Sequence, residues 1–335
     1  MKNAHIVFEL TNNCNLQCFH CMRDKSAPPG YLPLEIIKKV LGESKLVNNI
    51  DIVSFTGGEP TLHPQLPEIL KIVSHLGYSF GLVTNGWHFP DTYRVLLPYK
   101  SILKGITFSL DGAKEETHDR LRGKGSYRRV MQAVSICIVR DIPFTFNTSV
   151  TSHNYGELKE VAELVSKLGS RGLRFGHLMP TPLTARHKLD LPLDKQREVE
   201  NTVSLLQGTF PLRIAMAPRD YITPNPPCTP LRMEEFNIDW RGNLTLCCNL
   251  SGYGSGEKDG DIIGNLCQMS YSEAYGRLVT LNRKFCNDKR QDNRYEDSDS
   301  FPCWYCLNYF KKMDWLKEFP GNPWSRMVWT EGVFA

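Results

Sequence analysis

Three cysteines near the start of the chain, Cys14, Cys18 and Cys21, lie in the segment CNLQCFHC with the spacing C-x3-C-x2-C. Three thiolates on one tight loop can hold three irons of a 4Fe–4S cube, which four cysteines usually bind. The fourth iron would then lack a protein ligand, and an open metal position can bind and activate a substrate. A zinc site is the competing interpretation. It would need a fourth ligand nearby, and His20 lies inside the loop at an awkward position.

The cysteine content of the whole chain also favours metal binding. Eleven cysteines is an odd number, and a secreted disulfide framework would normally be a short chain behind a signal peptide. The N-terminus has no apolar h-region, and no run of about 18 apolar residues occurs, so we expect no membrane span and a cytoplasmic location. The net charge of +4 comes from basic residues interleaved with acids, so a nucleic acid or a membrane surface is not an expected partner.

Apolar strands alternate with amphipathic helices over the first two thirds of the chain, which predicts parallel βαβ units. The expected strands are 5–10, 51–56, 79–84, 105–110, 143–150 and 172–179. The expected helices are 33–47, 64–76, 91–97, 126–140, 155–169 and 193–207. Six such units predict an α/β fold with a partial (β/α)6 barrel, which binds its ligands at the carboxyl ends of the strands.

The region after about residue 205 has a different pattern. We expect residues 1–205 to form the barrel and residues 206–335 a smaller, irregular domain made of short elements. It should contain a hairpin at 236–247 and an exposed polar loop at 287–300. Aromatic residues are frequent from Trp304 to Phe334; they are expected to pack the C-terminus against the barrel mouth, and the alternative is an apolar rim for a flat substrate.

The cysteine loop resembles the signature of the radical S-adenosylmethionine (SAM) superfamily. In that family the open iron is chelated by the amino and carboxylate groups of SAM. An electron from the reduced cluster then cleaves the sulfonium to methionine and a 5′-deoxyadenosyl radical, which abstracts hydrogen. The family usually has an aromatic residue before the last cysteine, beside the adenine; here that position is His20.

Polar residues at the ends of later strands are also similar to the family's SAM-binding positions. Gly57-Gly58-Glu59-Pro60 follows the second strand and matches the GGEP motif, whose glycines allow close backbone approach and whose carbonyls and carboxylate suit an ammonium group. The segment 120–127 resembles the loop that closes over SAM. The resemblance implies that SAM contacts come from His20, Gly57, Gly58, Glu59, Asn85, Ser109, Asp111, Asn147, His177 and Met179.

A second set of cysteines lies in the C-terminal third. Cys228, Cys247 and the C-x2-C pair Cys303 and Cys306 supply four thiolates, enough to saturate a cube or to bind zinc. The arrangement resembles the SPASM and shorter "twitch" extensions of radical SAM proteins, which bind auxiliary 4Fe–4S clusters. A full SPASM domain continues with three more cysteines, and residues 307–335 contain none. The resemblance therefore implies one auxiliary cluster, with electron transfer as its simplest role.

Four cysteines remain outside these two sets. Cys248 and Cys267 are close enough in sequence to the predicted ligands to substitute for them. Cys137 is expected on the apolar face of a helix, in the core of the protein, and Cys286 is expected to be inert. The histidines other than His20 show no ligand spacing.

The resemblance implies a radical SAM enzyme that abstracts hydrogen from an unactivated carbon. The leading hypothesis for the substrate is a ribosomally made peptide or a protein side chain, recognised directly or through a separate recognition protein. The alternatives are a small-molecule dehydrogenase, acting on a sugar alcohol or in a cofactor pathway, and a cobalamin-dependent methyltransferase. A non-catalytic iron–sulfur protein would not need the SAM-type residues. The expected electron donor is a flavodoxin or ferredoxin.

Overall fold

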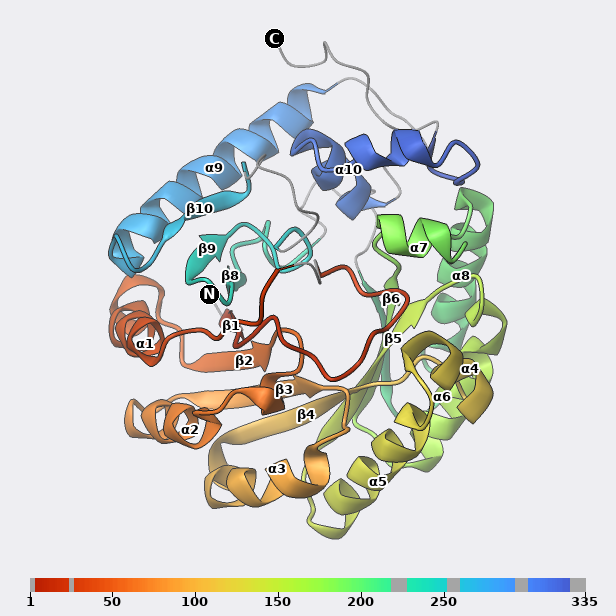
Figure 1. Cartoon of the computed structure of the whole chain (residues 1–335), viewed down its shortest axis with the longest axis horizontal. Helices are drawn as coiled ribbons and strands as arrows, with labels where there is room; N and C mark the ends of the chain where they lie inside the picture. Colours follow the sequence, from red (N-terminus) through yellow and green to blue (C-terminus); the bar gives the residue numbers. More distant parts are fainter. Residues whose placement is uncertain (1–3, 24–26, 218–227, 252–259, 293–300, 326–335) are drawn as a thin grey trace.

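One continuous sheet organises the computed structural model, which describes residues 4–23, 27–217, 228–251, 260–292 and 301–325. Within these ranges the sheet has ten strands in the order β10-β9-β8-β1-β2-β3-β4-β5-β6-β7. The strands curve around an open centre, and helices cover the outer side of the curve (Figure 1). This is the predicted α/β fold with a partial barrel.

Six parallel strands form the predicted barrel, and each pairs with the next along the chain. Their bounds are β1 (His5–Glu9), β2 (Ile52–Thr56), β3 (Ser79–Thr84), β4 (Leu103–Ser109), β5 (Phe144–Val150) and β6 (Gly172–His177). The helices between and after them are α1 (Leu34–Asn48), α2 (Leu66–His75), α3 (Phe89–Leu96), α4 (Glu115–Arg122), α5 (Ser126–Val139), α6 (Leu158–Lys167), α7 (Pro182–Arg186) and α8 (Leu193–Leu206). Short 3₁₀ turns are η1 (Pro60–Leu62), η2 (Leu97–Ile102), η3 (Tyr155–Glu157) and η5 (Asp314–Glu318).

The sheet continues beyond these six strands at both edges. β7 (Arg213–Ala217) pairs in parallel with β6, and β8 (Glu235–Ile238) pairs in parallel with β1. The predicted hairpin consists of β8 and the antiparallel β9 (Asn243–Thr245), and β10 (Ile262–Asn265) adds to its far side. The sheet hydrogen bonds join strands before residue 205 to strands after it, in the pairs β1–β8 and β6–β7. The division into domains at residue 205 stays a prediction.

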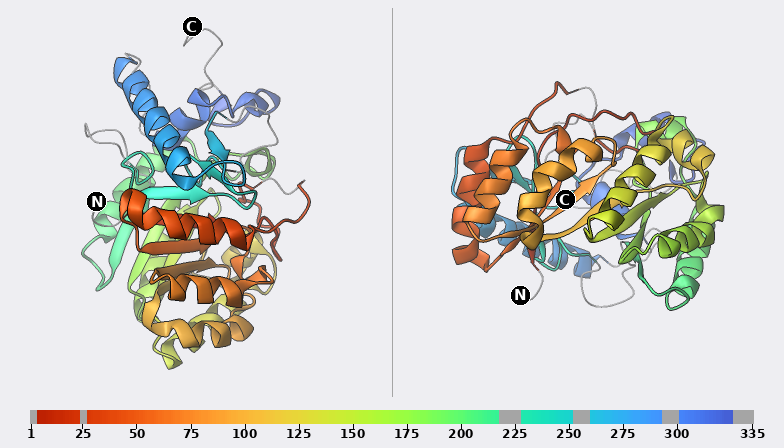
Figure 2. Two further views of the ribbon diagram at one scale, coloured as in Figure 1. Left: turned by 90° about the vertical axis from the view of Figure 1, so that its left-hand side faces the viewer. Right: turned by 90° about the horizontal axis from the view of Figure 1, so that it is seen from below.

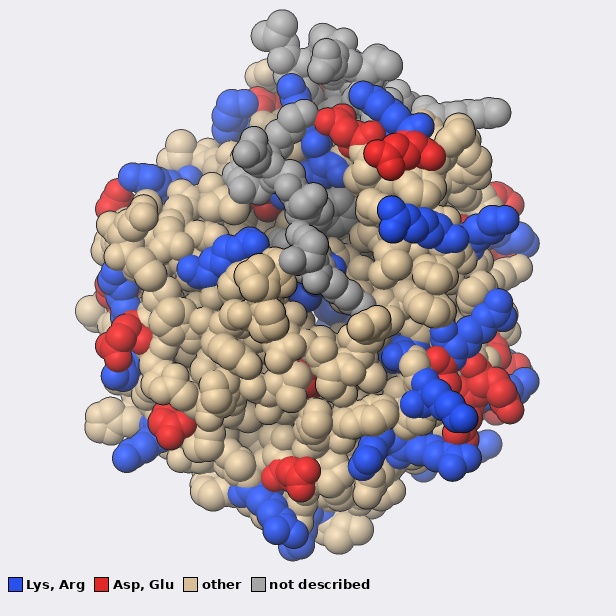
Figure 3. Space-filling model, viewed as in Figure 1, with Lys and Arg blue, Asp and Glu red and all other residues tan. Residues whose placement is uncertain are grey.

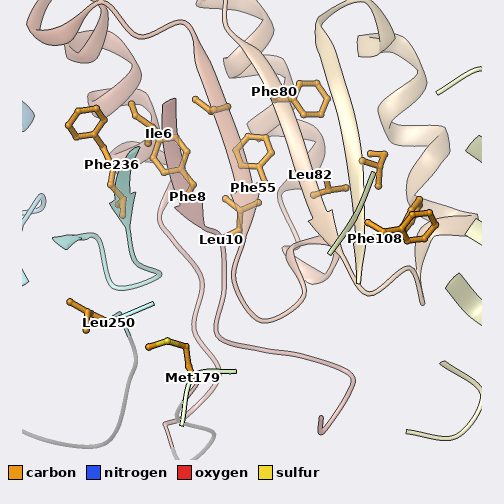
Figure 4. Packing of buried hydrophobic residues seen from close by; sticks show 14 of the residues in the cluster. Ile6, Phe8, Leu10, Phe55, Phe80, Leu82, Phe108, Met179, Phe236 and Leu250 are labelled. Atoms are coloured by element: carbon orange, nitrogen blue, oxygen red, sulfur yellow. The ribbon is translucent and has the colours of Figure 1, made fainter. Parts of the chain in front are cut away.

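The core lies between the strands and the helical layer. Aromatic rings from neighbouring strands pack in sequence, with ring centroids 6.3 Å apart for Phe8 and Phe55 and 5.9 Å apart for Phe55 and Phe80 (Figure 4). Phe236 of β8 is fully buried on the other side of β1. The residues that alternate with these buried side chains face the inside of the barrel, where the sites described below are found.

The C-terminal third contains a long helix that contradicts the prediction of only short elements there. α9 (Tyr271–Gln291) begins at Ser270, whose side chain accepts a hydrogen bond from the Glu273 backbone N–H. Its buried residues recur at helical spacing, so packing decides the helix although its composition is mostly polar. The predicted loop at 287–300 is therefore helical through Gln291, and residues 293–300 lie outside the described ranges.

The aromatic residues near the C-terminus form a buried cluster, as the packing interpretation predicted for the part that is described. Trp304 of α10 (Pro302–Tyr309) and Trp324 are both buried, with ring centroids 4.8 Å apart. The Trp324 Nε1–H donates a hydrogen bond to the Leu191 carbonyl at 3.1 Å, which attaches the segment to the loop before α8. Trp329 and Phe334 lie outside the described residues. α9 and α10 lie together on one side of the barrel (Figure 2).

Charged side chains of both signs lie mainly toward the rim of the face in Figure 3. In the ranges that the structure describes, no helix combines the length and the apolar character needed to cross a bilayer.

The attachment of the C-terminal segment should depend on pH through Asp190. Its carboxylate accepts hydrogen bonds from Thr184 Oγ1 and Asn322 Nδ2, and burial nevertheless raises its pKa from 3.8 to about 6. A raised pKa means that the folded state binds a proton more tightly, so the protein gains stability as the pH falls from 7 toward 4. We expect Asp190→Asn to stabilise the protein by about 1 to 3 kcal/mol at pH 7.5 and to lose that advantage near pH 4.

Urea unfolding of both proteins at several pH values checks this expectation. A stability difference that is the same at pH 4.5 and 7.5 would contradict it.

Candidate SAM and iron–sulfur sites

The cysteine loop is closed at its base by hydrogen bonds to the end of the sheet. Leu10 donates its backbone N–H to the Thr56 carbonyl of β2, and Leu32 donates to the Leu10 carbonyl. The Thr11 hydroxyl donates to the Gly30 carbonyl at 2.6 Å. These contacts hold both ends of the loop at the carboxyl ends of β1 and β2, so its residues 12–23 begin at that edge of the sheet (Figure 1).

The GGEP segment packs directly against this loop. Gly58 donates its backbone N–H to the Thr11 carbonyl at 2.7 Å, and Glu59 donates to the Asn13 carbonyl at 2.8 Å. A Cβ at Gly58 would overlap the Asn13 carbonyl, and Gly57 has φ of +134°, which side chains rarely adopt. Both glycines are therefore needed, because the backbone of the GGEP segment lies directly against the backbone of Thr11 and Asn13, just before Cys14.

Gly58→Ala should consequently detach the cysteine loop from the barrel. We expect a loss of about 2 to 3 kcal/mol in the free energy of unfolding, because neither backbone segment can yield to the new methyl group, together with reduced iron content. Gly42→Ala is the matched control. Gly42 lies inside α1 with nothing within 4 Å of an added Cβ, so that variant should gain about 0.5 to 1 kcal/mol. Urea unfolding and iron analysis measure both, and equal stabilities would contradict the proposed close approach.

The Glu59 carboxylate, for which an ammonium contact is predicted, is hydrogen-bonded within the protein. Its side chain is fully buried, and its carboxylate accepts hydrogen bonds from both the N–H and the hydroxyl of Thr61, from the Thr84 hydroxyl and from the Asn85 N–H. The carboxylate thus joins the end of β2 to the end of β3. A direct contact with SAM stays a prediction; the described contacts make Glu59 a positioning residue.

Asn85 and Ser109 lie where a cofactor could reach them. The Asn85 Nδ2 donates to Asn15 Oδ1 at 2.9 Å and lies 3.8 Å from the Cys14 Sγ. Ser109 closes β4 with its side chain toward the barrel interior. Both line the cavity of the cysteine loop, as the strand-end pattern predicted.

Asp111 is the centre of a buried ionic network. Its Oδ2 accepts from the Arg122 Nε and lies 3.1 Å from the His20 Nε2, while its Oδ1 accepts from the Ser149 N–H at 2.8 Å. Burial alone would raise its pKa, but Arg122 and His20 hold the pKa of this carboxyl well below its usual range. Asp111 lines neither cavity, so its described role is to position His20 of the cysteine loop; a ribose contact stays a prediction.

Arg122 is the functional candidate that the sequence reasoning left unnamed. The segment 120–127 is not a loop throughout: α4 runs to Arg122, and a turn with positive φ at Gly123 and Gly125 leads into α5. The helix end directs the guanidinium into the cavity of the cysteine loop, where Nη1 lies 3.9 Å from the Cys18 Sγ. A guanidinium beside these thiols can stabilise a thiolate and can also bind the carboxylate of a ligand in the cavity.

The first cavity, of about 440 Å³, brings together the three N-terminal cysteines and the ends of four neighbouring strands. Burial raises the pKa of the Cys14 thiol to about 11, so binding of iron there must release its proton. The donor set fits an iron–sulfur cluster with an amino acid beside it, because thiols, backbone edges, an amide and a guanidinium face one space. The predicted site residues that line it are Cys14, Cys18, His20, Cys21, Gly57, Gly58, Asn85 and Ser109.

A second cavity, of about 650 Å³, is lined by five cysteines of the C-terminal region. His20 lines both cavities, so the two are neighbours. The predicted site residues that line the second one are Asn147, His177, Met179, Cys228, Cys247, Cys303 and Cys306, and Cys248 joins them. His177, expected beside SAM, therefore belongs to this second wall, where its Nε2 lies 2.8 Å from Glu200 Oε1 of α8.

The C-terminal thiols have surroundings that suit a cluster. The Asn249 N–H donates to the Cys247 Sγ at 3.3 Å, and the Asn249 amide lies 3.7 Å from the Cys303 Sγ. Such donors stabilise sulfur that carries negative charge. Among the described residues, no three His, Cys, Asp or Glu side chains are close enough together to hold one metal ion. The ligand assignments at both sites therefore stay predictions.

The four cysteines outside the two predicted sets differ in their surroundings. Cys137 is fully buried in α5, as predicted, and Cys267 is exposed. Neither Cys267 nor Cys286 lines a described cavity, whereas Cys248 donates its thiol to Glu235 Oε1 at 3.3 Å on the wall of the second one. The sequence alone could not tell which of Cys248 and Cys267 lies beside the predicted ligands. In the structure Cys248, which follows β9, lines the second cavity and Cys267 does not.

Residues 8–165 match the family model of the radical SAM superfamily. The cysteine loop, the GGEP segment and the strand ends that surround the first cavity lie in this range, which is just under half of the chain.

Several relatives of known name share this part. An AdoMet-dependent heme synthase of Methanosarcina barkeri is 32% identical over 186 residues, which is 54% of this chain and 53% of the relative. The subtilosin biosynthesis protein AlbA of Bacillus subtilis is 32% identical over 175 residues, or 51% of this chain and 38% of the relative. The chain spans about half the length of the curated relatives it matches.

A crystal structure of Streptococcus suis SuiB bound to its precursor peptide SuiA has the same fold, with a TM-score of 0.65 and 15% identity. The similarity covers 81% of this chain and 64% of that one. It therefore extends beyond the range of the family model.

Proposed function

We propose that this protein is an enzyme that cleaves SAM in the first cavity and abstracts hydrogen from a substrate in the second. The observation that supports it is the meeting of Cys14, Cys18 and Cys21 with the polar ends of four strands in one cavity that adjoins a larger one. A 4Fe–4S cluster and SAM, when bound there, supply the reductive cleavage of the sulfonium to a 5′-deoxyadenosyl radical.

The residues around the first cavity have separate tasks in this proposal. Backbone carbonyls at Gly57 and Gly58 accept from the ammonium group of SAM, and Arg122 pairs with its carboxylate. Asn85 and Ser109 offer hydrogen bonds to the ribose hydroxyls. His20 lies at the boundary of the two cavities, where its ring is held by Asp111 and can lie beside the adenine.

The C-terminal thiols are proposed to hold one auxiliary 4Fe–4S cluster through Cys228, Cys247, Cys303 and Cys306. Four thiol ligands leave no open iron, so the cluster would transfer electrons: it accepts the electron left on a substrate radical, or relays one from a flavodoxin or ferredoxin. In this proposal residues 206–335 act as an auxiliary unit on the barrel of residues 1–205. Cys248 is the fifth thiol on the same wall, where Glu235 accepts its hydrogen bond.

A peptide or protein side chain is the proposed substrate class. It is supported by the similarity to AlbA, which is named for biosynthesis of a bacteriocin, and to SuiB, whose structure contains a precursor peptide. A small-molecule oxidation is the second candidate, because the heme synthase of M. barkeri is also 32% identical over a similar range.

The reconstituted and reduced protein is expected to convert SAM to methionine and 5′-deoxyadenosine. The reaction can be followed by liquid chromatography with mass detection, with the oxidised protein as the control. Failure to form 5′-deoxyadenosine with a fully loaded N-terminal cluster would contradict the proposed function. Addition of a candidate precursor peptide should increase turnover and change the peptide mass, whereas turnover that responds only to small metabolites would favour the second candidate.

A further inference from the structure

The part of the second cavity wall that β6 and β7 form carries two arginines whose charge the described part of the fold does not use. Arg174 of β6 and Arg213 of β7 both line this cavity. Among the residues that the structure describes, neither forms an ion pair, and both side chains are exposed to the cavity side of the sheet. A guanidinium stays charged at every physiological pH, so two uncompensated positive charges face the space proposed for the substrate.

The alternation of the two strands explains why these side chains point inward. Leu173, Phe175 and Ile214 are buried, so they face the helical layer, and the residues between them must face the inside of the barrel. The pairing register sets Arg174 beside Ala215 and Arg213 beside Gly172. Each arginine thus has a small residue as its cross-strand neighbour, which leaves the wall open and lets two long side chains reach a common ligand.

The position of Arg174 relates it to the SAM cavity. Ser109, Asn147 and Arg174 are register partners on the adjacent strands β4, β5 and β6. Ser109 lines the first cavity and the other two line the second. With neighbouring strands about 4.8 Å apart, Arg174 lies about 10 Å from Ser109 in the backbone. A group held by Arg174 is therefore one small-molecule length from the site where hydrogen would be abstracted.

Other charged groups on the cavity wall are already bonded within the protein. Arg232 donates its Nε to Glu234 at 2.9 Å. Glu235 lies on the cysteine wall, where it accepts from the Thr229 hydroxyl and from the Cys248 thiol. The cavity wall thus combines the thiols with positive charge on β6 and β7 that forms no ion pair among the described residues.

We propose that Arg174 and Arg213 together bind an oxyanion group of the substrate, a carboxylate or a phosphate, and so orient its reacting carbon toward His20. This inference rests on the proposed function, because it assigns the second cavity to the substrate. An acidic side chain of a peptide and a small organic acid carry the same chemistry, and the fork of donors on each guanidinium matches both.

Binding to the cluster-loaded, SAM-bound protein tests the proposal at low salt by calorimetry. The probes are the peptide acetyl-Gly-Glu-Gly-Glu-Gly-amide, its glutamine counterpart, citrate and pyrophosphate. At least one anionic probe should bind, and Arg174→Gln and Arg213→Gln should each weaken it by about tenfold or more, the loss expected for a charged hydrogen bond. Arg171→Gln is the matched control, since Arg171 is exposed and lines neither described cavity.

Each outcome of these measurements supports or overturns the proposed oxyanion site. Preference for the acidic peptide over its glutamine counterpart, lost in both variants, supports the site with a peptide source. Citrate or pyrophosphate binding lost in both variants supports it with a small-molecule source. No binding by any anion, or equal weakening in Arg171→Gln, overturns it. If the wild type still forms 5′-deoxyadenosine from SAM, only this inference fails and the proposed function stands.

Discussion

Alanine at Cys14, Cys18 or Cys21 is expected to remove about four iron atoms per chain and to abolish formation of 5′-deoxyadenosine, while about four iron atoms remain. Each thiol lines the first cavity, and a cube with only two protein ligands and an open iron has too few bonds to persist. The irons that remain would belong to the C-terminal thiols. Iron analysis, the visible absorption of the cluster and a SAM cleavage assay measure the three parts of this expectation.

Cys267→Ala is the matched control for this series, because Cys267 is exposed and lines neither described cavity. It should keep the iron content of the wild type. Cys303→Ala should lose the other half of the iron. Complete loss of iron in Cys14→Ala would argue against an auxiliary cluster, and zinc in place of the remaining iron would remove the electron-transfer role proposed for it.

The second large effect is expected at Asp111. Asp111→Ala leaves the Arg122 guanidinium and the His20 ring without the buried carboxylate between them, at a cost of about 3 to 5 kcal/mol in the free energy of unfolding. The cysteine loop would then lose its ionic contact with α4 and keep the hydrogen bond from the Phe19 N–H to the Leu121 carbonyl, so iron incorporation should fall as well. Asp141→Asn is the control: its ion pair with Lys100 is highly exposed, and its stability should change by less than about 0.5 kcal/mol.

A double-mutant cycle and a pH series separate this network from general loss of packing. Asp111→Asn combined with Arg122→Gln should cost less than the sum of the single changes, because each removes the same ion pair. The low pKa of Asp111 in the folded state makes its contribution present above the unfolded value of 3.8 and lost as the pH falls below it. Additive effects would show that Asp111 does not act through this pair.

Much of the barrel was predictable from the chain because it depends on local pattern. Alternating apolar strands and amphipathic helices predicted all six barrel strands, and their bounds shift by only a few residues in the structure. α9 was missed because its polar composition hides a buried stripe, including Leu278 and Phe285, that matters only once the barrel is beside it. β7 was missed for a related reason: with Arg213 and two alanines, it has little apolar pattern of its own.

The positions of Glu59 and Asp111 could not be read from their strand-end locations. Both are acids that follow a strand in a recognisable motif, which predicted that they face a ligand. In the structure, donors from other elements occupy their oxygens, including Thr84 and Arg122, and both side chains are buried behind the cavity wall. A motif shows which residues come together at the barrel opening; packing determines which of them remain open to solvent.

The sequence by itself determined that three thiols lie on one short loop, because the spacing of Cys14, Cys18 and Cys21 sets this whatever surrounds the loop, and the proposed chemistry begins from that loop. The tertiary structure alone decided how that chemistry is divided in space. Asn147 and His177, whose contact with SAM stays a prediction, line the second cavity together with the C-terminal cysteines, because β8 pairs with β1 and brings residues far apart in the chain to one cavity. Only such long-range pairing brings Arg174 and Cys303 to the wall of one cavity, and local pattern carries no information about it.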